Sequence, residues 1–170
     1  MEEIETSIHV RPATRADLPG ILAIYNDAVL TTTASYDYEP RSFEAQELWF
    51  EQHETAGLPV LIAESADGKL LGWSTLSAFR PRPGYRFTCE NSVYVAAEAR
   101  GRGVGKRLLE PLIAEARRLG YRSIIAVIDA RNDVSLRLHA NFGFEQAAYL
   151  KNVGFKFDRW LDIILMQLQL

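Results

Sequence analysis

Hydrophobic and polar residues alternate along the chain with two different periods. Where β-branched and aromatic residues occupy every second position the pattern predicts a strand, and where apolar residues recur at every third or fourth position it predicts a helix. Strands are expected over residues 8–11, 60–63, 70–76, 87–95, 123–128, 144–149 and 162–168, and helices over residues 14–29, 42–52, 108–119 and 134–142. We therefore expect an α/β fold in which helices flank a sheet.

The second predicted helix shows how the pattern also assigns a buried face. Ser42 is a typical helix start and Gly57 a typical residue just beyond a helix end. Within this helix the spacing of apolar residues predicts that Phe43, Leu48 and Trp49 face the protein interior.

The most informative stretch is residues 92–107, which joins a predicted strand to a predicted helix. Glycines at positions 101, 103 and 105 lack the Cβ that would keep a ligand away from the backbone, and they can adopt positive φ. The first N–H groups of the following helix have no intrahelical partners and carry the positive end of the helix dipole. Four cations add to this positive charge, namely Arg100, Arg102, Lys106 and Arg107. The stretch predicts a phosphate-binding turn, and the alternative is a glycine-rich helix entry with solvated arginines.

Spacing excludes two common phosphate-binding motifs for this turn. A Walker-type loop needs glycine where this chain has Arg100, and it needs serine or threonine where this chain has Arg107. A dinucleotide-binding motif that begins at Gly101 needs glycine at position 106, which is lysine. The turn therefore binds phosphate in some other way.

Composition narrows the class of protein. With 170 residues, 48% of them hydrophobic and 24% charged, the chain predicts one globular domain over residues 1–170. Its formal net charge of -3 argues against general binding to nucleic acid or to a membrane surface. Cys89 is the only cysteine, which excludes an intrachain disulfide and a cysteine-rich metal site, and we expect it in the core. The acidic N-terminus gives no secretory signal and no run is long enough to span a membrane, so we expect a cytoplasmic enzyme.

The pattern Arg-x-x-Gly-x-Gly at Arg100, Gly103 and Gly105, between a strand and a long helix, resembles the acetyl-CoA-binding motif of the GNAT family of N-acetyltransferases. A second motif, which runs from Asn132 through Asn141 to Phe144, resembles the loop and short helix of that family. The resemblance implies the GNAT fold, a mixed and mostly antiparallel sheet flanked by helices. It also implies that backbone amides hold acetyl-CoA, the cosubstrate, without a metal.

Three separated features narrow the resemblance. His139 stands where the wider family more often has tyrosine, and the segments 88–95 and 153–162 also agree with one subfamily. The chain is similar there to phosphinothricin and methionine sulfone or sulfoximine N-acetyltransferases. The resemblance implies transfer of acetyl to the α-amine of a small amino acid or analogue by direct attack in a ternary complex, and a homodimer. Acetylation of a protein N-terminus or other amine, and a catalytically silent acyl-CoA-binding module, are the alternatives.

The chemistry of amide formation assigns candidate catalytic residues. Neutral amine must be produced, the thioester carbonyl polarised and the thiolate released. Glu90, which shares a strand face with Ser92 and Tyr94, is the candidate general base, directly or through one water. His139 is the candidate that donates to the thiolate or takes the amine proton, and a hydrogen-bonded core histidine is its alternative. The residues that the resemblance assigns to the cosubstrate are Val93, Tyr94, Val95, Arg100, Gly101, Arg102, Gly103, Val104, Gly105, Lys106, Asn132 and Asn141.

Two segments are candidates for binding the amino acid. Residues 79–86 form a proline-broken loop with arginines that suit a carboxylate, and residues 31–36 are a hydroxyl-rich stretch that ends in an aromatic ring. The candidate residues are Tyr36, Arg80, Arg82, Gly84, Tyr85 and Arg86. A solvated surface loop and a plain helix connector are the respective alternatives. The aromatic segment 151–160 lines the site and a dimer interface by resemblance, or is otherwise a surface hairpin that covers the core.

Overall fold

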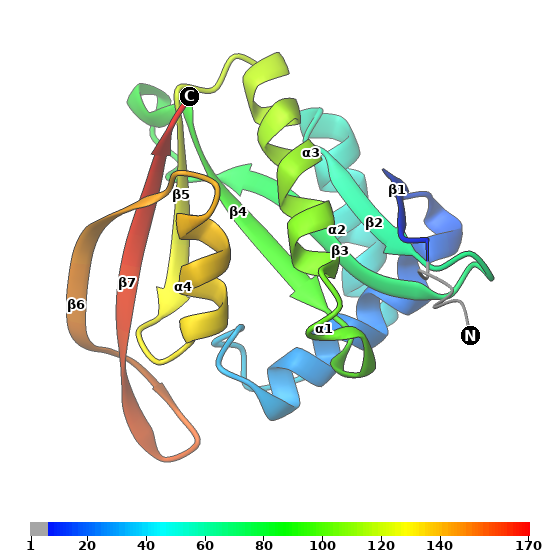
Figure 1. Cartoon of the computed structure of the whole chain (residues 1–170), viewed down its shortest axis with the longest axis horizontal. Helices are drawn as coiled ribbons and strands as arrows, with labels where there is room; N and C mark the ends of the chain where they lie inside the picture. The colour runs from blue at the N-terminus through cyan, green and yellow to red at the C-terminus, as the bar shows by residue number, and fades with distance from the viewer. Residues whose placement is uncertain (1–6) are drawn as a thin grey trace, which may run out of the picture.

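The computed structural model describes residues 7–170 and contains a seven-stranded sheet in the order β1-β2-β3-β4-β5-β7-β6 (Figure 1). Neighbouring strands are antiparallel except β4 and β5, which are parallel. The strands are β1 His9–Pro12, β2 Val60–Glu64, β3 Leu70–Ala78, β4 Thr88–Val95, β5 Ser123–Asp129, β6 Glu145–Lys156 and β7 Arg159–Gln169. The mixed, mostly antiparallel sheet is the one that the family resemblance implies. The acidic segment 1–5, where no secretory signal is expected, lies outside the described residues.

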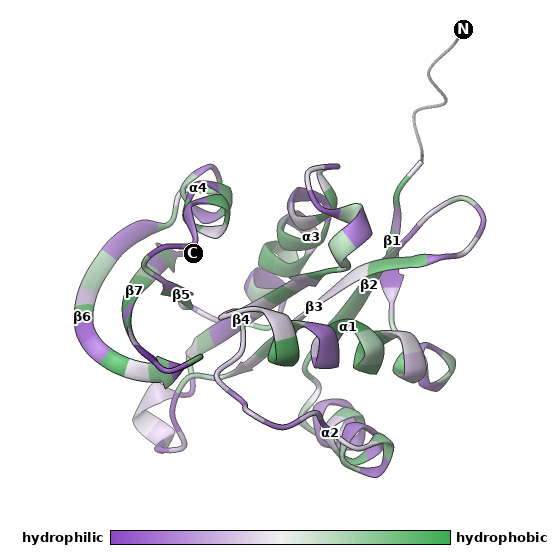
Figure 2. Cartoon of the chain, turned by 90° about the horizontal axis from the view of Figure 1, so that it is seen from below, coloured by the Kyte–Doolittle hydropathy of each residue, from purple (hydrophilic) through white to green (hydrophobic). Residues whose placement is uncertain are grey.

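Within residues 7–170, four α-helices cover the two faces of this sheet. They are α1 Leu18–Thr31, α2 Phe43–Ala56, α3 Val104–Arg118 and α4 Asp133–Ala140. Figure 2 shows α1 and α2 on one face and α3 and α4 on the other. The helix α3 is the crossover that a parallel pair of strands requires, here between β4 and β5. Within residues 7–170 no helix is long and apolar enough to cross a membrane.

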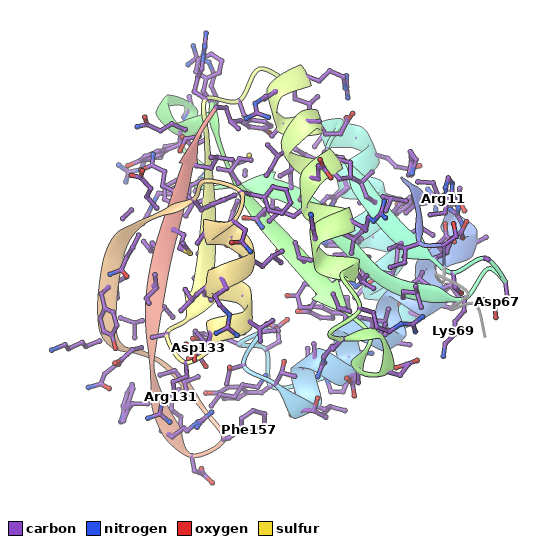
Figure 3. All side chains as sticks on the ribbon, viewed as in Figure 1. Arg11, Asp67, Lys69, Arg131, Asp133 and Phe157 are labelled. Carbon is purple, nitrogen blue, oxygen red and sulfur yellow. The ribbon has the colours of Figure 1, made fainter. Side chains whose placement is uncertain are left out.

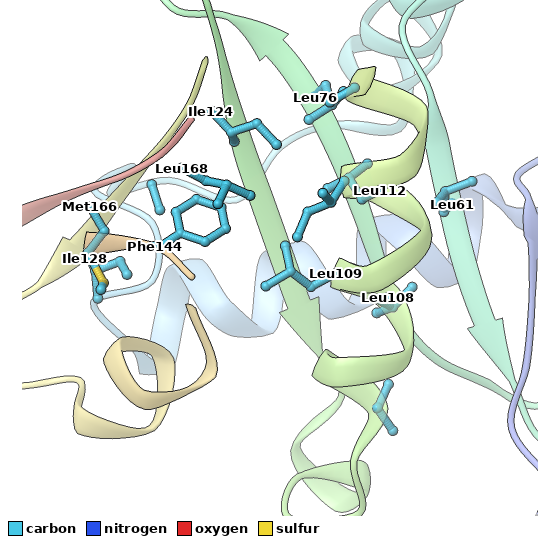
Figure 4. Packing of buried hydrophobic residues seen from close by; sticks show 14 of the residues in the cluster. Leu61, Leu76, Leu108, Leu109, Leu112, Ile124, Ile128, Phe144, Met166 and Leu168 are labelled. Atoms are coloured by element: carbon cyan, nitrogen blue, oxygen red, sulfur yellow. The ribbon is translucent and has the colours of Figure 1, made fainter. Parts of the chain in front are cut away.

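The larger core lies between the sheet and α3. Leu108, Leu109 and Leu112 of α3 are fully buried and belong to one cluster with Ile124 (Figure 4). Cys89 belongs to the same cluster. Burial of a leucine side chain stabilises a fold by about 1.5–3 kcal/mol, so this helix is fixed firmly against β4. The prediction that Cys89 is a core residue is confirmed.

The structure corrects the predicted buried face of α2. Phe43 is 46% exposed and Leu48 is 56% exposed, so neither faces inward. The buried residues of this helix are Gln46, Phe50 and His53, which recur at helical spacing. They define the inner face for two reasons. Phe50 packs into the smaller core cluster, on the side of the sheet that α1 covers. The Arg41 guanidinium donates to Gln46 Oε1 at 3.0 Å.

Strands β4 and β5 separate part-way along their length. Their pairing extends only from Thr88 opposite Ser123 to Glu90 opposite Ile125. Beyond that point β4 continues to Val95 and β5 to Asp129 without pairing to each other. Figure 1 shows the two strands diverging, with α3 and α4 following their separated ends. The divergence exposes a strand edge inside the sheet, where a ligand can lie against backbone groups.

Candidate active site

The glycine-rich turn after β4 has the backbone that the sequence predicts. Gly101 and Gly103 have φ of 76° and 78°, in the region that favours glycine. A Cβ built on either residue would meet nothing within 4 Å. The missing side chains therefore leave the backbone of this turn uncovered.

The first turn of α3 presents free amide groups. Arg107 N–H donates to the Gly103 carbonyl at 3.2 Å and makes the first bond of the helix. The N–H groups of Val104, Gly105 and Lys106 therefore have no intrahelical partner. Arg102, Lys106 and Arg107 are exposed beside them and line a hollow of about 660 Å³ with Gly103. Free amides, the helix dipole and cations on one turn fit a diphosphate.

Gly105 and Arg100 have roles in this turn that the sequence did not reveal. A Cβ on Gly105 would lie 3.1 Å from Leu138 Cδ2, so this glycine lets α4 approach the start of α3. Arg100 Nε donates to the Val95 carbonyl at 3.4 Å, and its guanidinium lies 3.8 Å from the Asp27 carboxylate. Gly105 thus serves helix packing, and Arg100 ties the turn to the end of β4.

The resemblance assigns Val93, Tyr94 and Val95 of β4 to the cosubstrate, and the backbone amides of these three residues point in different directions. Ala96 N–H donates to the Leu71 carbonyl at 2.9 Å, across from β4 toward β3. Because hydrogen bonding alternates along an antiparallel pair, Tyr94 N–H also faces β3, where Trp73 is its partner. The amides of Val93 and Val95 face the opposite way, toward the gap between β4 and β5. Of the three predicted donors, Val93 and Val95 are the ones that a ligand in the gap can reach.

Glu90 lies where the pairing of β4 with β5 ends. It is half-buried, and its burial raises the pKa of the carboxyl group, with no charged neighbour among residues 7–170 contributing to the shift. Tyr94 on the same strand face stacks on Trp73, with ring centroids 4.7 Å apart, on the side covered by α1 and α2. Glu90 therefore faces the α1 side of the sheet.

His139 lies on the other side of the sheet, and both of its ring nitrogens form hydrogen bonds within the protein. Its Nδ1 lies 2.8 Å from the Ser135 carbonyl and must donate to it, so Nε2 accepts the Asn91 amide hydrogen at 2.9 Å. The ring is 4% exposed, and burial lowers its pKa. These contacts match the core-histidine alternative better than a proton-transfer role. Asn91, which the sequence analysis did not single out, is the partner that alternation on β4 directs away from Glu90.

The buried histidine predicts a pH dependence of stability. The pKa of His139 is lower in the folded chain, so below its unfolded pKa of about 6.5 the unfolded chain binds more protons, and the free energy of unfolding falls with falling pH. His139→Gln should weaken this dependence, while His53, whose pKa burial also lowers, retains part of it. Urea unfolding between about pH 5 and 8 measures it. An identical dependence in wild type and variant would contradict the assignment of a buried neutral ring.

The two asparagines of the second motif lie at opposite ends of α4. Asn132 caps its start and accepts the Ser135 N–H at 3.1 Å, close to the end of β5. Asn141 is exposed at the other end. The start of α4 therefore faces the same opening as the start of α3, which suits Asn132 for a ligand there.

The two candidate amino-acid-binding segments lie on either side of Glu90 along β4. The arginine-bearing loop precedes β4, where it is paired with β5, and its Arg80 and Arg86 are exposed over the rings of Phe79 and Phe87. Tyr36 lies at the other end, where its ring lies against Gly154 of β6. Figure 3 shows Arg131 and Asp133 by the start of α4 and Phe157 at the tip of the β6–β7 hairpin, all at this open end.

The hairpin tip itself is only partly a surface structure. Phe155, Phe157 and Trp160 are 42%, 51% and 63% exposed, as expected for a surface hairpin. Lys156, between the two phenylalanines, is only 4% exposed. Alternation along the strand could have revealed it, because Gly154 and Lys156 share the face opposite to the phenylalanines.

Comparison with known proteins identifies the family of this chain. The model of the Acetyltransferase (GNAT) family matches residues 21–144. The chain belongs to the GNAT family. An L-methionine sulfoximine/L-methionine sulfone acetyltransferase from Pseudomonas aeruginosa is 44% identical over 164 residues, which cover 96% of this chain and 95% of the relative. A phosphinothricin N-acetyltransferase from Alcaligenes faecalis is 48% identical over 159 residues, covering 93% and 80%.

Solved structures agree with these relatives. The crystal structure of a GNAT superfamily phosphinothricin acetyltransferase from Sinorhizobium meliloti in complex with acetyl-CoA matches with a TM-score of 0.93 and 40% identity, covering 96% of this chain and 88% of that one. The predicted GNAT fold and the prediction of an acetyl-CoA-dependent N-acetyltransferase are thereby confirmed. Within residues 7–170 no group of three or more His, Cys, Asp or Glu side chains could hold a metal ion.

Proposed function

We propose that this GNAT protein transfers the acetyl group of acetyl-CoA to the α-amine of a small amino acid or analogue. Phosphinothricin and methionine sulfone or sulfoximine are the proposed acceptors, because the relatives carry those names at 44–48% identity. The observation that carries the proposal is the position of Glu90, at the point where β4 and β5 separate. Burial raises the pKa of its carboxyl group. Glu90 lies on the strand that leads into the proposed diphosphate-binding turn, and it faces the side of the sheet that α1 covers.

Glu90 is proposed to take the proton from the acceptor ammonium, directly or through one water. A carboxylate at its ordinary pKa of about 4.3 is a weak base, and burial strengthens it. Below its raised pKa Glu90 is protonated and cannot accept, so turnover should rise with pH through that value. The resulting neutral amine attacks the thioester carbon, and the amide product and free CoA thiol leave.

The backbone of β4 and α3 is proposed to hold the acetyl donor. The amides of Val104, Gly105 and Lys106 bind the diphosphate, with Gly101, Gly103 and the cations around them, and Asn132 contacts the arm that leads into the gap. The amides of Val93 and Val95 point into the gap and stabilise negative charge that develops on the thioester oxygen. His139 is proposed as a positioning residue that orients Asn91, since both of its ring nitrogens are already engaged.

The acceptor panel is the experiment that tests this function. Purified protein is mixed with acetyl-CoA and phosphinothricin, methionine sulfone, methionine sulfoximine, ordinary amino acids or short peptides, and thiol release is followed. We expect release with the small amino acids and analogues. Release with peptides alone would instead indicate an N-terminal acetyltransferase, and acetyl-CoA binding without turnover on any amine would indicate a silent binding module.

A homodimer is proposed through the exposed aromatic residues of the hairpin. Phe155, Phe157 and Trp160 form an apolar group at its tip, of the kind found at protein interfaces. We expect wild type to be a dimer by multi-angle light scattering and Trp160→Glu to be a monomer. Leu48→Glu, which changes an apolar residue that is 56% exposed on α2, should remain a dimer. A monomeric wild type would reject the interface. A cytoplasmic location is also proposed, in keeping with the lone buried Cys89.

A further inference from the structure

The tip of the β6–β7 hairpin grips the segment 32–38 that follows α1. Lys156 Nζ donates to the Thr32 carbonyl at 2.9 Å and to the Ser35 carbonyl at 2.6 Å. These contacts join residues more than 120 positions apart in sequence. A lysine held in the interior by two carbonyls fixes the backbone between them, because moving that segment would leave a buried ammonium unpaired.

A second contact from the same strand face seats an aromatic ring. A Cβ added to Gly154 would lie 3.0 Å from Tyr36 Cδ2 and closer still to Cε2. The ring therefore lies against the bare backbone of β6. Next to it, Tyr38 donates its hydroxyl hydrogen to the Phe155 carbonyl. Gly154 and Lys156 thus act on the same short segment.

The hairpin tip is itself held in a defined direction. The pairing of β6 with β7 shifts between Leu150 and Gly154, so β6 contains a bulge, and Asn152 there has φ of 51°. The Asp162 carboxylate pins the bulge, because it accepts the Asn152 N–H at 2.8 Å and the Tyr149 hydroxyl at 2.6 Å. A pinned bulge bends a strand, and here it precedes the residues that grip segment 32–38.

The gripped segment extends over the open end of the gap between β4 and β5. Tyr94, on the strand face of Glu90, donates to the Ala34 carbonyl at 3.4 Å, and Tyr25 of α1 shares a hydrogen bond of 3.2 Å with Ser35 Oγ. Tyr36 is 37% exposed, and its ring lies against Gly154 of β6. In the sheet β5 stands between β4 and β6, so the segment reaches from β4 past β5 on the α1 side, with the Tyr36 ring at its far end.

We infer that Lys156 and Gly154 are positioning residues for the acceptor, because they fix the Tyr36 ring as one wall of the pocket that admits it. The inference rests on the proposed function and names the part of the chain that sets acceptor size. A fixed ring excludes bulky side chains and orders small ones for attack on the thioester. A ring that is displaced or released should therefore change acceptor binding and discrimination and leave acetyl-CoA binding unchanged.

The test uses Gly154→Ala and Lys156→Met, with Lys69→Met as the control for an exposed lysine outside the hairpin. Gly154→Ala displaces only a partly exposed ring, so it should fold normally. For both variants we expect kcat/KM for methionine sulfone to fall roughly tenfold to a hundredfold, chiefly through KM, with the KM of acetyl-CoA unchanged. The preference for methionine sulfone over a bulkier amino acid should also shrink. Lys69→Met should match wild type.

A double-mutant cycle separates this positioning role from a merely structural one. In a Tyr36→Ala background Gly154→Ala should have no further effect on acceptor KM, since the ring it displaces is gone. Equal effects of Gly154→Ala with and without Tyr36, or wild-type acceptor KM and preference in Gly154→Ala, would overturn the inference. If Lys156→Met fails to fold, Gly154→Ala alone decides. Absence of turnover in wild type would instead reject the proposed function.

Discussion

Glu90→Gln is expected to lower turnover about 10²–10⁴-fold while acetyl-CoA binding stays as in wild type, because a general base contributes that much and glutamine cannot accept the proton. The variant keeps the shape and hydrogen-bonding reach of the side chain, so substrate binding should change little. Steady-state thiol release gives the turnover, and calorimetric titration with acetyl-CoA gives the affinity.

The same variant should be more stable than wild type at neutral pH. Burial raises the folded pKa of Glu90, so the folded chain binds more protons than the unfolded chain, and stability falls as pH rises through the interval between the two pKa values. Glutamine removes this loss, and the difference in melting temperature should vanish at acid pH, where Glu90 is protonated in both states. Glu47→Gln, at an exposed position of α2, is the matched control. Wild-type turnover in Glu90→Gln would remove this carboxylate from the mechanism.

Gly103→Val is expected to weaken acetyl-CoA binding by about 100-fold or more. Its side chain would occupy open space above the free amides, and loss of two hydrogen bonds to a charged group costs about 1.5–3 kcal/mol each. Valine at a φ of 78° is also strained, by about 1–3 kcal/mol, so some stability should be lost as well. The affinity is measured by calorimetric titration and the stability by thermal unfolding.

Gly57→Val separates these two effects. Gly57 also has positive φ, 65°, and open space around its Cβ position, but it ends α2 and is remote from the turn. We expect a similar loss of stability in the two variants and a loss of acetyl-CoA affinity in Gly103→Val only. Normal affinity in Gly103→Val would mean that the diphosphate is not bound at this turn.

Local sequence signals were sufficient for the elements and for the backbone conformation of the glycine-rich turn. The two periods located every strand and helix, and Gly101 and Gly103 have the positive φ expected of them. Boundaries were less accurate where tertiary contacts extend an element. The final strands are longer than predicted, because β6 and β7 continue past a bulge to the hairpin tip. The helix α3 begins at Val104, four residues before the predicted start at residue 108.

Packing between distant segments could not be read from periodicity. The apolar pattern of α2 suggested Phe43 and Leu48 as inner residues, and the helix instead buries Gln46 against Arg41. In the same way, histidine is a residue type often used in catalysis, so the sequence made His139 a candidate. Only the structure shows that its ring nitrogens are hydrogen-bonded to Asn91 and to the Ser135 carbonyl. The hydrogen bond from Lys156 to the Thr32 carbonyl joins segments that are distant in sequence, so it is visible only in the three-dimensional structure.

In Figure 1 the glycine-rich turn joins the end of β4 to α3, and β4 separates from β5 before that turn. Glu90 is the last residue of β4 that pairs with β5. The most direct measurement of their joint role is a crystal structure with acetyl-CoA and methionine sulfone bound. We expect the diphosphate on the amides of Val104–Lys106 and the acceptor amine within one water of the Glu90 carboxylate. A diphosphate bound elsewhere, or an amine on the face of β4 away from Glu90, would contradict the mechanism.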